Sequence, residues 1–129
     1  MGKIIYQAAA KTLTPVTLEL GGKSPTFVMA DCNLKMTAKR IVWGKFVNAG
    51  QTCIAPDYIL IQKDMKSHFV DYLKEEITKA YGENPSDSPD FARIVNLKNW
   101  QRLVNMIEPE KVIFGGKSNS LDCFIAPTL

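Results

Sequence analysis

The spacing of apolar residues along the chain predicts helices that alternate with short strands. Apolar positions recur every three or four residues in four segments, and this period is typical of a helix with one buried face. The predicted helices span residues 2–11, 34–47, 64–81 and 97–107. In the third of them, Asp64 is the expected N-cap, and Gly82 stands where a glycine commonly ends a helix. The expected buried face of this helix consists of Phe69, Leu73, Ile77 and Ala80.

Short extended segments separate the predicted helices. The expected strands are 16–20, 25–29, 58–61 and 111–114, and a last extended segment begins at 124–125. Residues 16–20 alternate between apolar and polar side chains, whereas residues 58–61 are all apolar, as expected for a strand covered on both faces. The alternation of strands and helices predicts an α/β fold with a largely parallel sheet flanked by helices.

The composition is that of an ordinary globular protein. The chain has 129 residues, of which 46% are hydrophobic and 22% charged, enough for one compact domain. No secretory signal opens the chain and no apolar run approaches the roughly 20 residues that span a bilayer, so a membrane anchor is expected only outside this segment. The net charge is +3, and the basic residues of 35–45 alternate with apolar ones. This pattern indicates a solvated helix face and no nucleic-acid partner.

The three cysteines indicate a reducing, cytoplasmic environment. Cys32, Cys53 and Cys123 are odd in number and widely spaced, which favours free thiols over a disulfide framework. With a single histidine and no CxxC pair, no metal site is expected. Cys32 and Cys123 are interpreted as structural residues. Cys53 is different because it lies in the loop 48–56, where glycine and small residues let the backbone approach a ligand.

Glu19 is the second candidate for chemistry. It lies near the end of the predicted strand 16–20, directly before two glycines, and it is either a solvent-facing strand residue or a functional carboxylate. The strand 25–29 advances roughly 15 Å. The helix 34–47 then returns roughly 21 Å. We therefore expect Cys53 near the edge where the chain left Glu19, with a thiol and a carboxylate facing one another across a cleft.

Two copies of the string Gly-Gly-Lys-Ser, at 21–24 and 115–118, do not form phosphate-binding loops. The Walker pattern requires a glycine five residues before the second glycine of each string. Those positions hold Thr17 and Lys111. The repeat is therefore interpreted as turn chemistry.

Two longer strings resemble the conserved motifs of the aldehyde dehydrogenase superfamily. Residues 18–25 (LELGGKSP) resemble its glutamate motif and residues 46–53 (FVNAGQTC) its cysteine motif, and the 34 residues between Glu19 and Cys53 agree with the family pattern. The strings at 13–19, 53–58, 81–84 and 125–128 are similar to the class 3 branch, which includes the fatty aldehyde dehydrogenases. The resemblance covers nearly the whole chain and is weakest at 31–39 and 111–124.

The resemblance implies a partial aldehyde dehydrogenase fold with a domain boundary. Residues 1–21 would end the NAD(P)-binding domain, and residues 22–129 would begin the catalytic (thiol) domain. The chain is accordingly expected to start inside a helix and to stop in an extended segment of a longer protein. The oxyanion-hole asparagine, the glutamate that holds a cofactor ribose and the dimerisation arm of a homodimeric parent would lie outside it.

The resemblance also implies roles for individual residues. Cys53 would be the nucleophile and Glu19 the base in the NAD(P)-dependent oxidation of aldehydes to carboxylic acids, through a thiohemiacetal and a thioester. Gly2, Glu19, Leu20 and Gly21 would contact NAD or NADP, with Gly2 closing the cofactor loop. Two alternatives remain open: a catalytically inert fragment that acts only as a structural or interaction module, and a cofactor-free thiol esterase.

Overall fold

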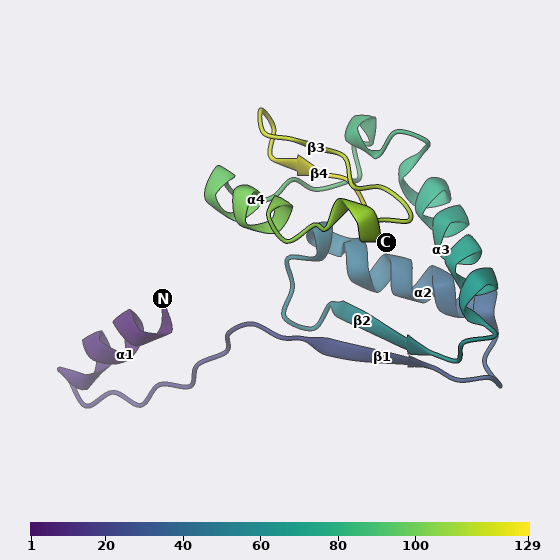
Figure 1. Ribbon diagram of the computed structural model, residues 1–129. Helices are drawn as coiled ribbons and strands as arrows, with labels where there is room; N and C mark the ends of the chain where they lie inside the picture. Colours follow the sequence, from purple (N-terminus) through teal and green to yellow (C-terminus); the bar gives the residue numbers. More distant parts are fainter.

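A parallel pair of strands, covered on one face by helices, forms the centre of the computed structural model (Figure 1). The structure describes residues 1–129. Its helices are α1 (Gly2–Ala10), α2 (Leu34–Phe46), α3 (Lys66–Tyr81) and α4 (Leu97–Val104), with 3₁₀ turns η1 (Val47–Gly50), η2 (Pro85–Asp87) and η3 (Pro109–Lys111). Its strands are β1 (Ser24–Val28), β2 (Pro56–Ile61), β3 (Ser118–Asn119) and β4 (Phe124–Ile125).

The order β1, α2, β2, α3 is an α/β arrangement, as predicted. Parallel strands cannot be joined by a tight turn, and α2 provides the connection that returns the chain to the start of β2. Asn33 caps α2, because its side chain accepts a hydrogen bond of 3.0 Å from the Met36 amide. After α2, the chain therefore arrives at the edge of the sheet where β1 and β2 both begin.

The main core lies between this sheet and the helices α2 and α3. The apolar spacing in both helices places one side chain per turn on the shared face, and Phe69 and Ile77 are almost completely enclosed. Burial of a large apolar side chain contributes about 1.5–3 kcal/mol, so this cluster dominates the stability of the unit. The core residues are Val28, Ala38, Ile41, Val42, Phe69, Leu73 and Ile77.

The other face of the sheet is open. Tyr58 and Leu60 of β2 are 48% and 45% exposed, and Phe27 of β1 is 66% exposed. The prediction that residues 58–61 are covered on both faces is therefore wrong. The helices of this chain pack on one face of the sheet only. Within residues 1–129, no second layer covers the apolar side chains on the other face.

Residues 82–129 pack against the end of α2 through aromatic contacts. Phe91 lies 4.9 Å from Tyr81, 6.3 Å from Phe46 and 6.0 Å from Phe124 between ring centroids. The indole of Trp100 donates a buried hydrogen bond of 2.8 Å to the Phe124 carbonyl. These contacts join α4 and the small antiparallel sheet of β3 and β4 to the central unit.

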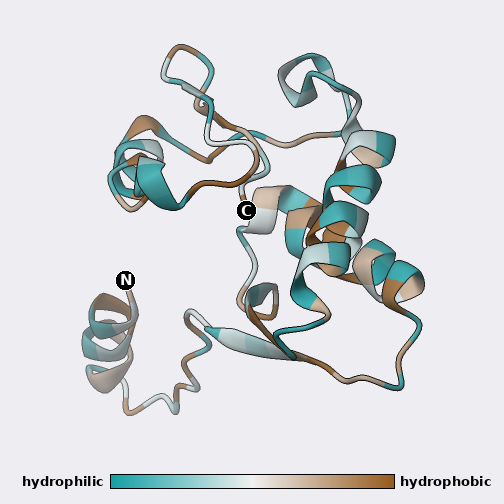
Figure 2. Cartoon of the chain, turned by 45° about the vertical axis from the view of Figure 1, so that its right-hand side comes forward, coloured by the Kyte–Doolittle hydropathy of each residue, from teal (hydrophilic) through white to brown (hydrophobic).

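The N-terminal arm, residues 1–22, leads away from this body (Figures 1 and 2). Helix α1 has no buried residue, and Ile4, Ile5 and Tyr6 on it are exposed. Residues 16–20 contain no strand, contrary to the prediction, because no strand of the chain pairs with their backbone groups. No helix of the structure is both long and apolar enough to cross a membrane.

Other predicted boundaries need correction. Residues 111–114 do not form a strand, since η3 and a short pairing of Ile113 and Phe114 with Leu129 replace it. Helix α3 begins after Met65 without a side-chain cap, so Asp64 does not cap it. Helix α4 ends at Val104, three residues earlier than predicted.

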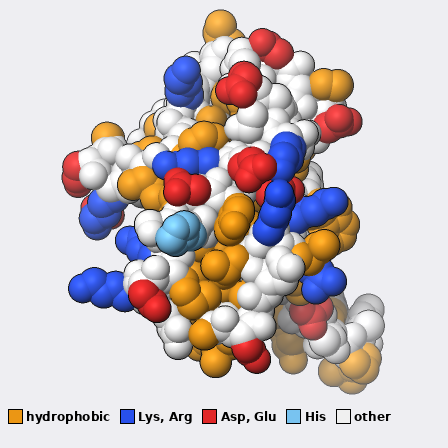
Figure 3. Space-filling model, turned by 90° about the vertical axis from the view of Figure 1, so that its right-hand side faces the viewer, with side chains coloured by type: hydrophobic (Ala, Val, Ile, Leu, Met, Phe, Trp, Pro, Cys, Tyr) orange, Lys and Arg blue, Asp and Glu red, His pale blue; other side chains and the backbone are white.

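The end of α3 follows the prediction more closely. Gly82 ends the helix with a φ of 81°, where a side chain would be strained. Ala80 is exposed, and Glu76 is the buried fourth residue of the inner face. Figure 3 shows acidic and basic side chains interspersed on this side of the molecule. On α3, Lys79 pairs with Glu75 and Glu76.

Candidate active site

The loop that carries Cys53 leaves α2 through three consecutive left-handed residues. Asn48, Ala49 and Gly50 have φ angles of 54°, 53° and 75°. A non-glycine residue in this region costs of the order of 1–3 kcal/mol, so Asn48 and Ala49 need surrounding contacts to hold them there. A side chain at Gly50 would lie 3.0 Å from the Lys45 carbonyl oxygen. The chain thus reverses tightly between α2 and β2.

Cys53 lies in a fixed turn at the start of β2. The Ala55 amide donates a hydrogen bond of 3.1 Å to the Thr52 carbonyl, which closes the turn around Cys53. Ala55 is buried, whereas Cys53 is exposed and its thiol is free. Cys32 and Cys123 are half-buried free thiols, and Cys32 packs against the main core. Of the three cysteines, Cys53 alone is exposed.

The segment after Glu19 reaches the backbone of Cys53. A Cβ atom on Gly22 would lie 2.0 Å from the Cys53 carbonyl oxygen and 3.6 Å from its Cα atom, so this position accepts only glycine. Next to it, the Lys23 ammonium lies 3.4 Å from the Asp57 carboxylate. Glu19 precedes Gly22 by three residues, which limits the distance between their Cα atoms to about 11 Å. The structure therefore brings the two motif segments together through Gly22.

Gly2 meets the same segment from α1. A Cβ atom on Gly2 would lie 3.2 Å from Leu18 Cδ1 and 3.4 Å from Leu20 Cδ2. The side chains of Leu18 and Leu20 thus both lie against Gly2. Glu19, Leu20 and Gly21 are exposed, and no atom lies within 4 Å of the position of a Gly21 Cβ. Two of the predicted cofactor contacts, Gly2 and Leu20, thus lie together.

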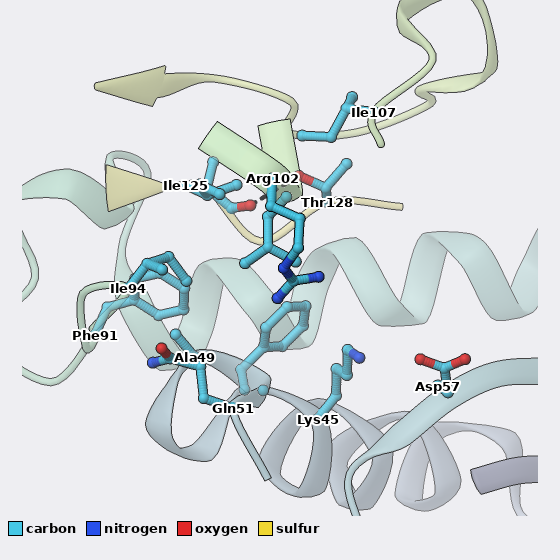
Figure 4. A pocket seen from close by; sticks show the side chains of 14 residues that line it. Lys45, Ala49, Gln51, Asp57, Phe91, Ile94, Arg102, Ile107, Ile125 and Thr128 are labelled. Carbon is cyan, nitrogen blue, oxygen red and sulfur yellow. Dashed lines mark hydrogen bonds between the residues drawn. The ribbon is translucent and has the colours of Figure 1, made fainter. Parts of the chain in front are cut away.

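A cavity of about 350 Å³ lies behind the cysteine loop, between the end of α2, helix α4 and the C-terminal segment (Figure 4). Figure 4 shows Ala49 and Gln51 on its α2 side, near Phe91 and Ile94. Neither Cys53 nor Glu19 lines this cavity, which is distinct from the side of the loop that Gly22 contacts. The lining residues are Lys45, Phe46, Ala49, Gly50, Gln51, Asp57, Phe91, Ile94, Arg102, Leu103, Ile107, Ile125, Ala126 and Thr128.

Gly22 is a site residue that the sequence reading did not identify. The sequence presents it as one of two glycines that end an extended segment, and only the fold shows that Cys53 lies against it. The signal available in the sequence is the glycine pair itself, because a close backbone approach is one of the few reasons that require glycine. Gly21, with open space beside it, does not have this constraint.

Comparison with known proteins decides the family. The sequence model of the aldehyde dehydrogenase family matches residues 1–129. The chain belongs to the aldehyde dehydrogenase family. Its resemblance to the class 3 branch is also confirmed, since it is 50% identical over 129 residues to aldehyde dehydrogenase family 3 member A2 of Pongo abelii.

Other aldehyde dehydrogenases give the same assignment. The dimeric NADP-preferring aldehyde dehydrogenase of Mus musculus is also 50% identical over 129 residues. The solved substrate-bound state of Staphylococcus aureus AldH superposes with a TM-score of 0.91 at 46% identity, over 98% of this chain and 28% of that one. The chain is covered completely by both curated relatives but spans only 27% and 28% of their lengths. The family and the fold are therefore established for a chain that spans only 27–28% of the length of these relatives.

Proposed function

We propose that this segment supplies the nucleophile and the base of an NAD(P)-dependent aldehyde dehydrogenase, within a longer protein that oxidises aldehydes to carboxylic acids. Family membership supports the reaction class. The single observation that carries the assignment of residues is the contact of Gly22 with the Cys53 backbone, which joins the glutamate segment to the cysteine loop.

The first step is addition of the Cys53 thiolate to the aldehyde carbonyl carbon. The C–S bond forms as the carbonyl π pair moves to oxygen, which gives a thiohemiacetal oxyanion. The Cys53 amide makes none of the backbone hydrogen bonds of its turn, so it is free to donate to this oxyanion. Loss of one such donor typically costs about 10²–10³ in rate. The exposed thiol on a fixed turn suits this role.

Leu20 and Gly21 are the residues that we assign to a nicotinamide cofactor. Both are exposed, and no atom lies within 4 Å of the position of a Gly21 Cβ. NAD or NADP, when bound, would accept the hydride that leaves the thiohemiacetal carbon. A Cβ atom on Gly2 would lie 3.2 Å from Leu18 and 3.4 Å from Leu20, so the start of α1 lies against this part of the arm.

Glu19 acts in the second half of the reaction. After the hydride has left, the substrate carbon is bound to Cys53 as a thioester. Glu19 takes a proton from a water molecule, which attacks the thioester carbon, and the C–S bond breaks to release the carboxylic acid and the Cys53 thiolate. Its exposed position leaves the carboxylate accessible to water.

The proposal extends to the setting of the longer protein. We place it in the cytoplasm, since all three cysteines are free thiols. A homodimer is proposed because one relative is named as dimeric.

Aldehyde-dependent NAD(P)H formation by the longer protein tests the assignment. Cys53→Ala removes the nucleophile and should abolish turnover, whereas Cys32→Ala should retain it. Glu19→Gln should let the acyl group accumulate on the Cys53 peptide, where mass spectrometry detects it. Turnover by Cys53→Ala, or hydrolysis of the thioester at the normal rate by Glu19→Gln, would refute the corresponding role.

The 129-residue chain alone distinguishes the alternatives. NADH formation from aldehyde by this chain eliminates the inert module. Hydrolysis of an activated ester that is lost in Cys53→Ala would favour the thiol esterase.

A further inference from the structure

Gln51 connects the cysteine loop to a distant part of the chain through every polar group of its side chain. Its Nε2 donates to the Asn48 carbonyl at 3.0 Å and to the Arg93 carbonyl at 3.1 Å. Its Oε1 accepts from the Val95 amide at 2.9 Å. A primary amide has two N–H donors, and both have partners here. The side chain is therefore held in one orientation between the loop and residues 93–95.

These bonds close the strained part of the loop. The backbone N–H of Gln51 also donates to the Asn48 carbonyl at 3.1 Å. The Asn48 side chain in turn donates to the backbone carbonyl of Gln51 at 3.3 Å. Asn48 and Ala49 have left-handed backbones between these contacts. Such a conformation persists only when its surroundings fix it. Gln51 provides that fixation two residues before Cys53.

The receiving segment is itself anchored. The Arg93 guanidinium bonds to the Asp122 carboxylate at 2.8 Å and to the Ser86 carbonyl at 2.6 Å, and it lies 4.9 Å from the centre of the Phe124 ring. The Ile94 amide donates to the Cys123 carbonyl at 3.1 Å. The partner of Gln51 is thus a rigid segment of the C-terminal part, and not a mobile surface loop.

We propose that Gln51 is a positioning residue, which fixes the backbone direction at Cys53 and so aims its thiol and amide toward the side of the loop that Gly22 contacts. This proposal rests on the proposed function of Cys53. It differs from that function in acting through the loop, because Gln51 points away from Cys53 and toward the cavity behind it.

The test replaces Gln51 by groups of nearly the same shape in the longer protein. Gln51→Glu keeps an acceptor for Val95 but faces two carbonyl oxygens with a carboxylate. Gln51→Met removes the bonds without adding charge. The matched control is Gln62→Glu, the same change on an exposed residue after β2. Three quantities are measured: the rate of Cys53 alkylation by iodoacetamide, read on its peptide by mass spectrometry, the turnover, and the midpoint of urea unfolding.

At neutral pH, both Gln51 variants should alkylate Cys53 and turn over about 10–10²-fold more slowly than the wild type, since small misplacements at a reacting group have effects of this size. As the pH falls from about 7 to about 4, through the ordinary pKa of a glutamate near 4.3, the ratio of Gln51→Glu to wild type should rise, because a protonated carboxyl again donates a hydrogen bond. The ratio for Gln51→Met should stay constant, and Gln62→Glu should match the wild type throughout.

A purely structural role would lower the urea midpoint of both Gln51 variants together with turnover, while Cys53 is alkylated as fast as in the wild type or faster, and that result would overturn the proposal. Normal alkylation and turnover in Gln51→Met would overturn it as well. The proposed function fails separately, through turnover by Cys53→Ala, and the alkylation rates still test Gln51 in that case.

Discussion

The central unit from β1 to α3 and the N-terminal arm differ in whether the residues that could pack against them lie within this chain. The unit encloses its apolar side chains between its own strands and helices, and Phe69, Leu73 and Ile77 have neighbours on every side. The arm has the same kind of amphipathic sequence but no buried residue in α1 and no paired strand at 16–20. Apolar periodicity thus predicts which face of a helix or strand is apolar enough to be buried. Only the rest of the fold determines whether that face is covered within the chain.

The largest expected effect is in the core of the unit. Phe69→Ala removes an almost fully buried ring and should lower the free energy of unfolding by about 3–5 kcal/mol. Leu13→Ala in the arm, where the side chain is 91% exposed, should leave it unchanged. Urea unfolding of the chain followed by circular dichroism measures both. Equal effects of the two substitutions would remove the distinction between unit and arm.

The next effect concerns the junction of the two regions. Gly22→Ala forces a methyl group into the Cys53 carbonyl, so the arm must shift, and turnover of the longer protein should fall by about 10²-fold or more. Gly44→Ala is the matched control, because its methyl group would meet Pro56 at an ordinary 3.7 Å. It should keep full turnover and gain up to about 1 kcal/mol of stability. An active Gly22→Ala would contradict the contact.

A smaller effect tests how α4 is held to β4 within residues 82–129. Trp100→Phe keeps an aromatic side chain, although a smaller one, and leaves the buried Phe124 carbonyl without its donor, which should cost at least about 1–3 kcal/mol. Unlike the arm, this part of the chain then depends on a specific polar contact between two of its own elements. A change in unfolding free energy below about 0.5 kcal/mol, measured by urea unfolding, would indicate that apolar contacts alone hold α4 against β4.

The smallest effect is expected for the surface pair beside Gly22. Lys23→Met breaks the contact with Asp57, in which the lysine side chain is 77% exposed, and exposed pairs contribute at most about 1 kcal/mol. We expect the free energy of unfolding to fall by this amount or less, and the difference from the wild type to disappear at high salt. Thermal melting at low and high salt, compared with Asp57→Asn, measures it. A large shift independent of salt would show that Lys23 packs against the junction.

The sequence predicts the fold of the unit well for a physical reason. The side chains that face inward on α2 and α3 recur at helical spacing, and β1 and β2 were both placed to within two residues. The strands predicted at 16–20 and 111–114 do not form, because their apolar patterns contain no information on a pairing partner. The end of α4 was placed too late and the 3₁₀ turns were not predicted, since short-range backbone hydrogen bonds determine both.

The candidate site was predicted less completely than the fold. The motifs and their spacing singled out Glu19 and Cys53, and the strand–helix geometry correctly predicted that the chain returns to the edge where β1 begins, with Cys53 beside Gly22. The expected facing of the Glu19 carboxylate and the Cys53 thiol stays a prediction. The roles of both residues, the cofactor contacts and the domain boundary at 21–22 remain predictions. Gly22 and Gln51 were not identified, because their importance comes from neighbours far away in the sequence.

The contact at Gly22 also makes the junction a pivot. Glu19 lies at the end of a lever of up to about 11 Å measured from that glycine, so a rotation of the arm by about 10° would move the carboxylate by about 2 Å while the Cys53 turn stays still. Any swing of the flanking region about this point therefore changes the separation of acid and sulfur without disturbing the folded body. Under the proposed function, the orientation of the arm would thereby set how close the base lies to the thioester on Cys53.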